Sequence, residues 1–162
     1  MKLGLLSDTH NDQRHVKQAL ARFRQEGVTI LLHAGDVTSK KTLRLFKGFD
    51  LYISRGNMDR DPGLRQVTES MFGLGRFKMI HRLTFDGLKI AMTHGDNHHD
   101  YTQLIESQAY DYIIRGHTHR RRDENVGPTR VINPGAVRTR WHVATCAILN
   151  TQTGDLTWIQ LA

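Results

Sequence analysis

The sequence predicts an α/β fold in which two packed β-sheets are flanked by helices. Short apolar segments alternate with amphipathic ones, which is typical of helices layered against sheets. The first half follows the order strand, helix, strand, helix, strand, and the second half is mainly strands with one helix. Because no internal repeat or low-complexity tract interrupts this order, we expect one domain over residues 1–162.

Apolar spacing locates the elements of the first half. Val16, Leu20 and Phe23 fall on one face of a helix that Gly27 should end. The predicted elements are strands at 3–6, 28–32 and 51–54 and helices at 11–26 and 41–47. The stretch 60–78 is polar and punctuated by glycine, so we expect a surface excursion or a lid.

Turn residues organise the second half. Asp86-Gly87 separates two strand-like runs and predicts a hairpin, and 150–155 (NTQTGD) predicts a turn. The predicted elements are strands at 83–85, 88–92, 112–114, 131–132, 142–149 and 156–161 and a helix at 102–109.

Composition narrows the function classes. No apolar run approaches the ~20 residues of a membrane span. Cys146 is the only cysteine, which excludes a disulfide framework and favours a cytoplasmic location. The formal charge of +7 favours anionic partners such as phosphorylated small molecules or nucleic acid.

Polar residues that bind metals follow five of the predicted strands. These residues are Asp8, His10, Asp36, Asn57, His94, His117 and His119. Loops at the carboxyl ends of strands form ligand sites in open α/β folds, so we expect the seven to meet at one rim. On extended chain, residues two apart point to the same side, which predicts Asp8 with His10 and His117 with His119 as pairs on one face.

The chemistry of this set indicates a metal site. It combines carboxylate oxygen, amide oxygen and imidazole nitrogen without thiolate, which suits Mn²⁺, Fe or Zn²⁺. Seven ligands are too many for one tetrahedral ion. Two ions about 3.5–4 Å apart, bridged by one carboxylate, would use them all.

The order of the motifs is similar to that of a known family. The motifs are Asp8-x-His10, Gly35-Asp36, Gly56-Asn57, His94-Gly95 and Gly116-His117-x-His119. They resemble the calcineurin-like metallophosphoesterase family, especially its small single-domain phosphodiesterases and the related retromer subunit. The resemblance runs from about Leu3 to Leu149 and implies a four-layer α-β-β-α sandwich.

The resemblance also implies roles for individual residues. One ion would be bound by Asp8, His10 and His119, a second by Asn57, His94 and His117, and Asp36 would bridge them. Asp36 and Asn57 are therefore the candidate catalytic residues. Mn²⁺ is the favoured metal, with Ni²⁺, Fe or Zn²⁺ as alternatives. A homodimer or homotetramer is compatible with the resemblance.

Two positions depart from the family pattern. Met58 stands where many relatives carry a histidine thought to assist the leaving group, which lowers the expected rate. Asp96 follows His94-Gly95 where relatives often have another histidine. The turn Asn133-Pro-Gly-Ala resembles the family's Asn-Pro-Gly-Ser turn, and we expect it to lie close to the metals.

Four kinds of prediction concern residues outside the ligand motifs. Asp59 is either a residue that orients a ligand histidine or one without a role at the site. His33 is expected to be an ordinary histidine, and His98 and His99 to be solvated near the start of a helix. Cys146 is expected to be inert core.

The predicted function is hydrolysis of small phosphodiesters by a hydroxide generated between two metal ions. Arg55, Arg60 and Arg120 are the candidates for binding the substrate phosphate. Two alternatives remain: a non-catalytic protein-interaction scaffold of the same fold, and a nuclease or nucleic-acid binder. The complete ligand set favours the enzyme, and no membrane partner is expected.

Overall fold

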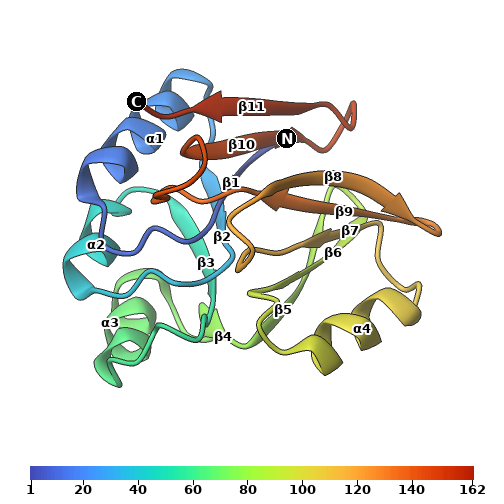
Figure 1. Cartoon of the computed structure of the whole chain (residues 1–162), viewed down its shortest axis with the longest axis horizontal. Helices are drawn as coiled ribbons and strands as arrows, with labels where there is room; N and C mark the ends of the chain where they lie inside the picture. The colour runs from blue at the N-terminus through green and yellow to red at the C-terminus, as the bar shows by residue number, and fades with distance from the viewer.

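The structure is a computed structural model that describes residues 1–162, and it contains two β-sheets covered by helices (Figure 1). The first sheet has the order β11-β10-β1-β2-β3-β4 and the second has the order β5-β6-β7-β9-β8. The strands of the first sheet are β1 (Lys2–Leu6), β2 (Ile30–His33), β3 (Asp50–Ser54), β4 (Phe77–Lys78), β10 (Thr145–Asn150) and β11 (Leu156–Gln160). Those of the second are β5 (Ile80–Phe85), β6 (Leu88–Thr93), β7 (Tyr112–Ile114), β8 (Arg121–Val126) and β9 (Thr129–Pro134).

Four helices cover the outer faces of the two sheets. They are α1 (Gln13–Gln25), α2 (Lys40–Leu45), α3 (Gly63–Phe72) and α4 (His98–Glu106). Figure 1 shows α1, α2 and α3 together on one side of the molecule and α4 on the opposite side. The predicted class, two packed sheets flanked by helices, is confirmed. None of these helices has the length and apolar character needed to cross a membrane.

Three apolar cores separate four layers. Strand side chains alternate between two buried faces: Leu31 packs in the core that includes α1 and α2, whereas Leu32 packs in the core between the sheets. In the second sheet, Ile114 faces the same central core, and Ile113 packs with Leu104 of α4. The continuous apolar runs of the sequence are therefore strands buried on both faces.

The parallel strands end level with one another. Leu6 of β1 is paired with His33 of β2, which is paired with Ile53 of β3. In the second sheet, Met92 of β6 is paired with Ile114 of β7. Loops that leave the carboxyl ends of these strands therefore start side by side.

The prediction for residues 60–78 is wrong. The stretch contains α3 and β4, and it is neither an excursion nor a lid. Leu64 and Thr68 lie one helical turn apart and are buried, and Phe77 of β4 pairs with Ile53 and enters the core. The charged residues and glycines of this stretch obscured its apolar periodicity in the sequence. Packing against the core stabilises the helix.

Several boundaries in the second half also differ from the prediction. β8 was missed because its sequence RRDENV is polar at an exposed sheet edge. α4 begins at His98 because Asn97 caps it by accepting a hydrogen bond from the Asp100 amide. β10 begins only at Thr145, so the residues before it form a loop. The hairpin at Asp86-Gly87 is confirmed, and both residues have the positive φ of a type I′ turn (50° and 80°).

Candidate metal centre

The seven predicted ligands lie in loops that follow β1, β2, β3, β6 and β7, and backbone hydrogen bonds join these loops. The Asp8 amide donates to the Gly35 carbonyl at 2.9 Å, and the His10 amide donates to the Asp36 carbonyl at 3.0 Å. The Gly116 amide donates to the His94 carbonyl at 3.0 Å. The sheet register therefore brings residues that are distant in the sequence to one rim, as predicted.

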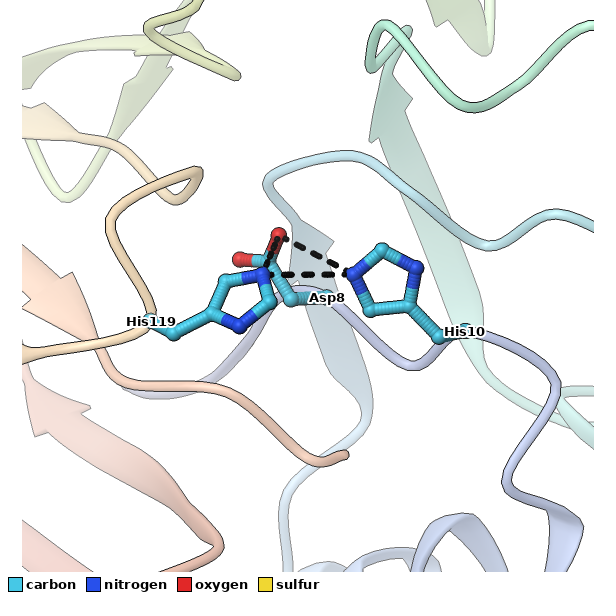
Figure 2. A group of neighbouring side chains, drawn as sticks. All are labelled: Asp8, His10 and His119. Atoms are coloured by element: carbon cyan, nitrogen blue, oxygen red, sulfur yellow. Dashed lines mark hydrogen bonds and ion pairs between the residues drawn. The ribbon is translucent and has the colours of Figure 1, made fainter. Parts of the chain in front are cut away.

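One group consists of Asp8, His10 and His119 (Figure 2). Asp8 Oδ1 lies 3.1 Å from His119 Nε2 and 3.7 Å from His10 Nε2, and the two Nε2 atoms are 3.3 Å apart. Both imidazoles point toward the same carboxylate oxygen. These are the three residues that the family resemblance assigns to one ion.

Asp36 stands between this group and a second one. Its Oδ2 lies 3.6 Å from His10 Nε2 and 3.5 Å from His94 Nε2. Its Oδ1 accepts a hydrogen bond from the Met58 amide at 2.9 Å, which fixes the carboxylate. A carboxylate oxygen between two imidazoles of different groups has the position of a bridging ligand.

The second group contains His94, Asn57 and His117. His94 Nε2 lies 3.1 Å from Asn57 Oδ1, and the rings of His94 and His117 meet edge to face with centroids 5.1 Å apart. His117 and His119 thus face different groups although one residue separates them. Asp8, Asp36 and His94 also lie close enough to hold one ion, so the two groups are continuous.

The backbone of the ligand loops is not extended, so the predicted basis for the pairing is wrong. Asp8 and His10 nevertheless lie in one group, whereas His117 and His119 do not. Asp8, His10, Asp36, His117 and His119 all have positive φ, between 40° and 68°. Residues with a side chain rarely adopt this left-handed conformation, and it persists only where surrounding contacts enforce it. His117 and His119 diverge because each is turned separately.

Three glycines allow the loops to approach this closely. A Cβ on Gly116 would lie 1.8 Å from Ser7 Oγ, and one on Gly56 would lie 2.1 Å from Asp36 Oδ1. A Cβ on Gly35 would lie 2.5 Å from His94 Nδ1. The glycines beside the ligands are therefore required for close approach, as the sequence indicated.

The polar atoms at the centre fit a divalent cation. Asp8 is fully buried, and its Oδ2 accepts hydrogen bonds from Ser7 Oγ and the His117 amide, whereas its Oδ1 has no hydrogen-bond partner. His94 Nδ1 lies 2.7 Å from the Ala34 carbonyl and donates to it, so the lone pair of Nε2 faces Asn57 Oδ1. Acceptors that face one another in a buried site are satisfied by a bound cation.

The electrostatics are consistent with a strong cation site. Burial acts to raise the pKa of Asp8, but the adjacent imidazoles of His10 and His119 outweigh it and hold the pKa below its ordinary value. The pKa of His119 is raised, mainly by its interaction with Asp8. Protons therefore compete with a metal for His119 as the pH falls.

His33, for which no role was predicted, forms hydrogen bonds that stabilise these loops. His33 is buried, accepts from the Gly35 amide at Nδ1 and lies 3.1 Å from Thr9 Oγ1 at Nε2. Burial lowers the pKa of His33 to about 3, so the ring is neutral. Its place at the end of a strand, before Gly35-Asp36, was the available signal.

Asp59 does not contact a ligand histidine. Its Oδ2 accepts from the backbone amides of Asp36 and Gly56 at 3.0 and 2.9 Å, and its Oδ1 accepts from the Thr38 amide at 2.7 Å. It therefore shapes the Asp36 loop directly. Burial is the main cause that raises the pKa of this carboxyl.

The predicted turn at Asn133 lies against the His117 loop. Asn133 Nδ2 donates to the Gly116 carbonyl and to Thr118 Oγ1, and its Oδ1 accepts from the Gly135 amide. This side chain joins the end of β9 to the loop that carries His117 and His119. The turn is thus close to the site, as predicted.

The predicted phosphate-binding arginines lie in different cavities. Arg55 and Arg60 line a cavity of about 370 Å³ together with Lys78. Arg120 lines another cavity, beside His119. His98 and His99 are exposed in the first turn of α4, and Cys146 is buried in the core.

Comparison with known proteins agrees with this geometry. Residues 1–154 match the calcineurin-like phosphoesterase superfamily domain. A phosphodiesterase of Methanocaldococcus jannaschii is 31% identical over 138 residues, 83% of each chain. The structure of an archaeal phosphodiesterase is 30% identical and superposes with a TM-score of 0.92, covering 99% of this chain and 100% of that one.

A variant of Vps29 from Entamoeba histolytica, 16% identical, shares the fold with a TM-score of 0.73 over the full length of both chains. The family match spans nearly the whole chain and includes all five ligand loops. The chain therefore belongs to the calcineurin-like phosphoesterase superfamily, whose members use a divalent metal centre.

Proposed function

We propose that this protein is a metal-dependent phosphodiesterase that hydrolyses small phosphodiesters. One observation carries the proposal: the carboxylates of Asp8 and Asp36 lie together with the imidazoles of His10, His94 and His119. Among these groups, Asp8 Oδ1 lacks a hydrogen-bond partner. The similarity to a phosphodiesterase of Methanocaldococcus jannaschii supports the choice of diesters.

The seven polar residues take the roles that the resemblance implies. We assign one ion to Asp8, His10 and His119, a second to Asn57, His94 and His117, and Asp36 to both. The contacts of Asp36 Oδ2 with His10 and His94 support the bridging role. When bound, two such ions supply a water of lowered pKa and positive charge for the phosphate oxygens. The thiolate-free oxygen and nitrogen set suits Mn²⁺, Fe or Zn²⁺. We propose Mn²⁺, the metal that the family resemblance favours, with Ni²⁺, Fe or Zn²⁺ as alternatives.

The chain itself contributes orientation and charge. The Met58 amide fixes the Asp36 carboxylate, and the Ala34 carbonyl fixes the His94 ring, so neither ligand must reorganise during turnover. Asn57 is exposed beside His94, where its amide can also contact the phosphate. Arg55 and Arg60 bring positive charge to the adjacent cavity.

Protonation of the leaving group is not assisted at position 58. Hydrolysis forms a bond from the water oxygen to phosphorus, breaks the ester bond and delivers a proton to the leaving alcohol. Met58, 42% exposed, has no proton to donate, so this position gives the leaving alcohol no general acid. We therefore expect activated leaving groups to react fastest.

Neither alternative function gains support. A scaffold needs a continuous apolar surface, whereas the exposed large apolar residues are scattered, with Trp141 and Val143 the one close pair in sequence. The formal charge of +7 suits nucleic acid and small phosphorylated molecules alike, so it does not raise nucleic acid above the small phosphodiester as the proposed partner.

The location, domain organisation and oligomeric state of the enzyme are also proposed. One buried thiol is compatible with work in the cytoplasm. Antiparallel pairing of β1 with β10 joins both ends of the chain in one sheet, which supports a single catalytic domain over residues 1–162. A homodimer or homotetramer stays a prediction.

The test is metal removal and replacement. Protein stripped with a chelator is assayed with bis-p-nitrophenyl phosphate and p-nitrophenyl phosphate, and Mn²⁺, Ni²⁺, Zn²⁺ or Fe is then added. We expect cleavage only with metal, fastest with Mn²⁺, and faster for the diester. Failure to cleave the diester with any of these metals would overturn the proposal, and preference for the monoester would change the substrate class.

A further inference from the structure

A polar and aromatic surface lies directly beside the Asp8–His10–His119 group. A cavity of about 250 Å³ is lined by His10, His119, Arg138, Thr139, Arg140 and Trp141. A neighbouring cavity of about 710 Å³ shares His119, Arg140 and Trp141 and adds Arg120, Arg121, His142 and Val143. The two share His119, Arg140 and Trp141 and lie beside the candidate ligand His119, so they offer space for a substrate that extends from the metal centre.

The loop that carries Trp141 is anchored to the ligand loop. The Arg138 amide donates to the Asp8 carbonyl at 3.0 Å, and Arg138 Nη1 donates to the His10 carbonyl at 3.0 Å. The Val137 amide donates to the Ser7 carbonyl at 3.0 Å. These bonds set the base of the loop relative to the metal ligands.

The side chain of Trp141 lies outside the apolar cores of the fold. It is 85% exposed, and its indole is absent from all three apolar cores. Large aromatic side chains are seldom left in water, because their burial is strongly favourable. A flat apolar ring beside a reaction centre suits the π-face of a planar group on the substrate.

The surrounding charge is positive and unpaired. Arg120, Arg121, Arg138 and Arg140 form no ion pair with a carboxylate, although Arg122 and Arg130 nearby do. Guanidinium groups bind phosphate in a bidentate manner and also stack on rings. An aromatic ring among unpaired arginines matches a nucleotide, which carries both a planar base and phosphate.

We propose that this surface is a substrate subsite for the nucleotide portion of a phosphodiester, with the base stacked on Trp141 and additional phosphate held by Arg120 and Arg140. The proposal rests on the proposed phosphodiesterase function and specifies its substrate class. Trp141 acts in binding and does not touch the reacting bond.

The kinetic test compares two diesters with the same leaving group. These are thymidine 5′-(p-nitrophenyl) phosphate and methyl p-nitrophenyl phosphate, assayed with the Mn²⁺-loaded protein. We expect wild type to favour the nucleotide ester about tenfold in kcat/KM, and Trp141→Ala to remove most of that preference. Leu74→Ala, which also truncates an exposed apolar side chain but lies outside the described cavities, should keep it.

A binding test separates this proposal from the enzymatic one. Calorimetry of the metal-free protein with adenosine 5′-monophosphate and ribose 5-phosphate compares two ligands that differ in the base. We expect tighter binding of the nucleotide by about tenfold, lost in Trp141→Ala, and weaker binding of both ligands in Arg140→Gln. Equal affinity for the two ligands would overturn the subsite even if diesters are cleaved. A base-dependent affinity would support it even if neither diester is cleaved.

A role for Trp141 in self-association would give a different experimental result. If wild type is an oligomer that Trp141→Ala dissociates, and the substrate preference is unchanged, Trp141 belongs to an interface and the subsite is wrong. A substitution that lowers kcat/KM equally for both diesters would likewise contradict selective stacking.

Discussion

The loops that hold Asp8, Asp36 and His94 contrast with those that carry Arg60 and Trp141. The first set is buried, has left-handed backbone at Asp8 and Asp36, and is tied together by hydrogen bonds between strands. The second is exposed and contributes unpaired positive charge around open cavities.

The contrast separates two demands on one site. Metal ligands must be held in place before the substrate arrives, which requires buried contacts that enforce an unfavourable backbone. Groups that select a substrate need access to solvent and can vary without disturbing the ligands. We therefore expect substitutions at the centre to abolish turnover or stability and substitutions at the rim to change affinity.

Loss of the bridging carboxylate should have the largest effect. Asp36→Asn removes the charge between His10 and His94 and should lower kcat more than about a hundredfold, beyond what loss of an outer partner costs. The metal-free variant should remain folded, because the Met58 amide can still donate to the side-chain oxygen. Activity and metal content, measured together, test this.

The matched control is Asp155→Asn in the exposed turn between β10 and β11, which should keep activity. Wild-type turnover by the Asp36 variant would contradict the bridging role.

Steric crowding at Gly116, in the metal centre, should have the second-largest effect. Gly116→Ala brings a Cβ against Ser7 Oγ and Asp8 Oδ2, and we expect it to lower the free energy of unfolding by about 1–3 kcal/mol and to weaken metal binding. Gly63→Ala at the start of α3 meets the flexible end of the Lys40 side chain and, at 3.2 Å, the Asp61 carboxylate, so its stability should hardly change. Urea unfolding compares the two, and equal stabilities would show that the loops are more adaptable than the geometry indicates.

The buried His33 should make the metal-free protein sensitive to acid. Burial lowers its pKa from 6.5 to about 3, so between these pH values the unfolded state binds a proton at His33 and the folded state does not. This contribution to stability is present above pH 6.5 and is lost by about 1.4 kcal/mol per unit as the pH falls toward 3.

His33→Gln should flatten that part of the pH profile. Urea midpoints at pH 7 and pH 5 give the measurement. A profile that stays as steep as wild type would assign the acid sensitivity to other groups.

Truncation at the rim should have the smallest effect. Arg60→Ala removes one exposed cation from the cavity that also contains Arg55 and Lys78. We expect KM for a diester to rise about threefold to fivefold with little change in kcat, because exposed charges contribute less than about 1 kcal/mol. Arg44→Ala, exposed on α2, is the control. A large fall in kcat would move Arg60 from the rim into the reaction itself.

Prediction from sequence succeeded where local pattern carries the signal. The apolar runs indicated strands buried on both faces, and the polar residues after them are the ones that meet at the rim. It failed for α3 and β8, whose composition is polar and whose structure depends on packing against the core or pairing with β9. It also failed for the conformation of the loops at the rim, since five of the predicted ligands have left-handed and not extended backbone.

The sequence alone indicated which side chains meet at the candidate metal centre, because the motifs and their positions after strands can be read directly along the chain. Only the tertiary structure decided how they meet. His10 and His119 are 109 positions apart, and their Nε2 atoms approach to 3.3 Å through the packing of two sheets. The same packing sets Asp59 beneath the Asp36 loop and Trp141 beside His119, contacts that no local spacing encodes.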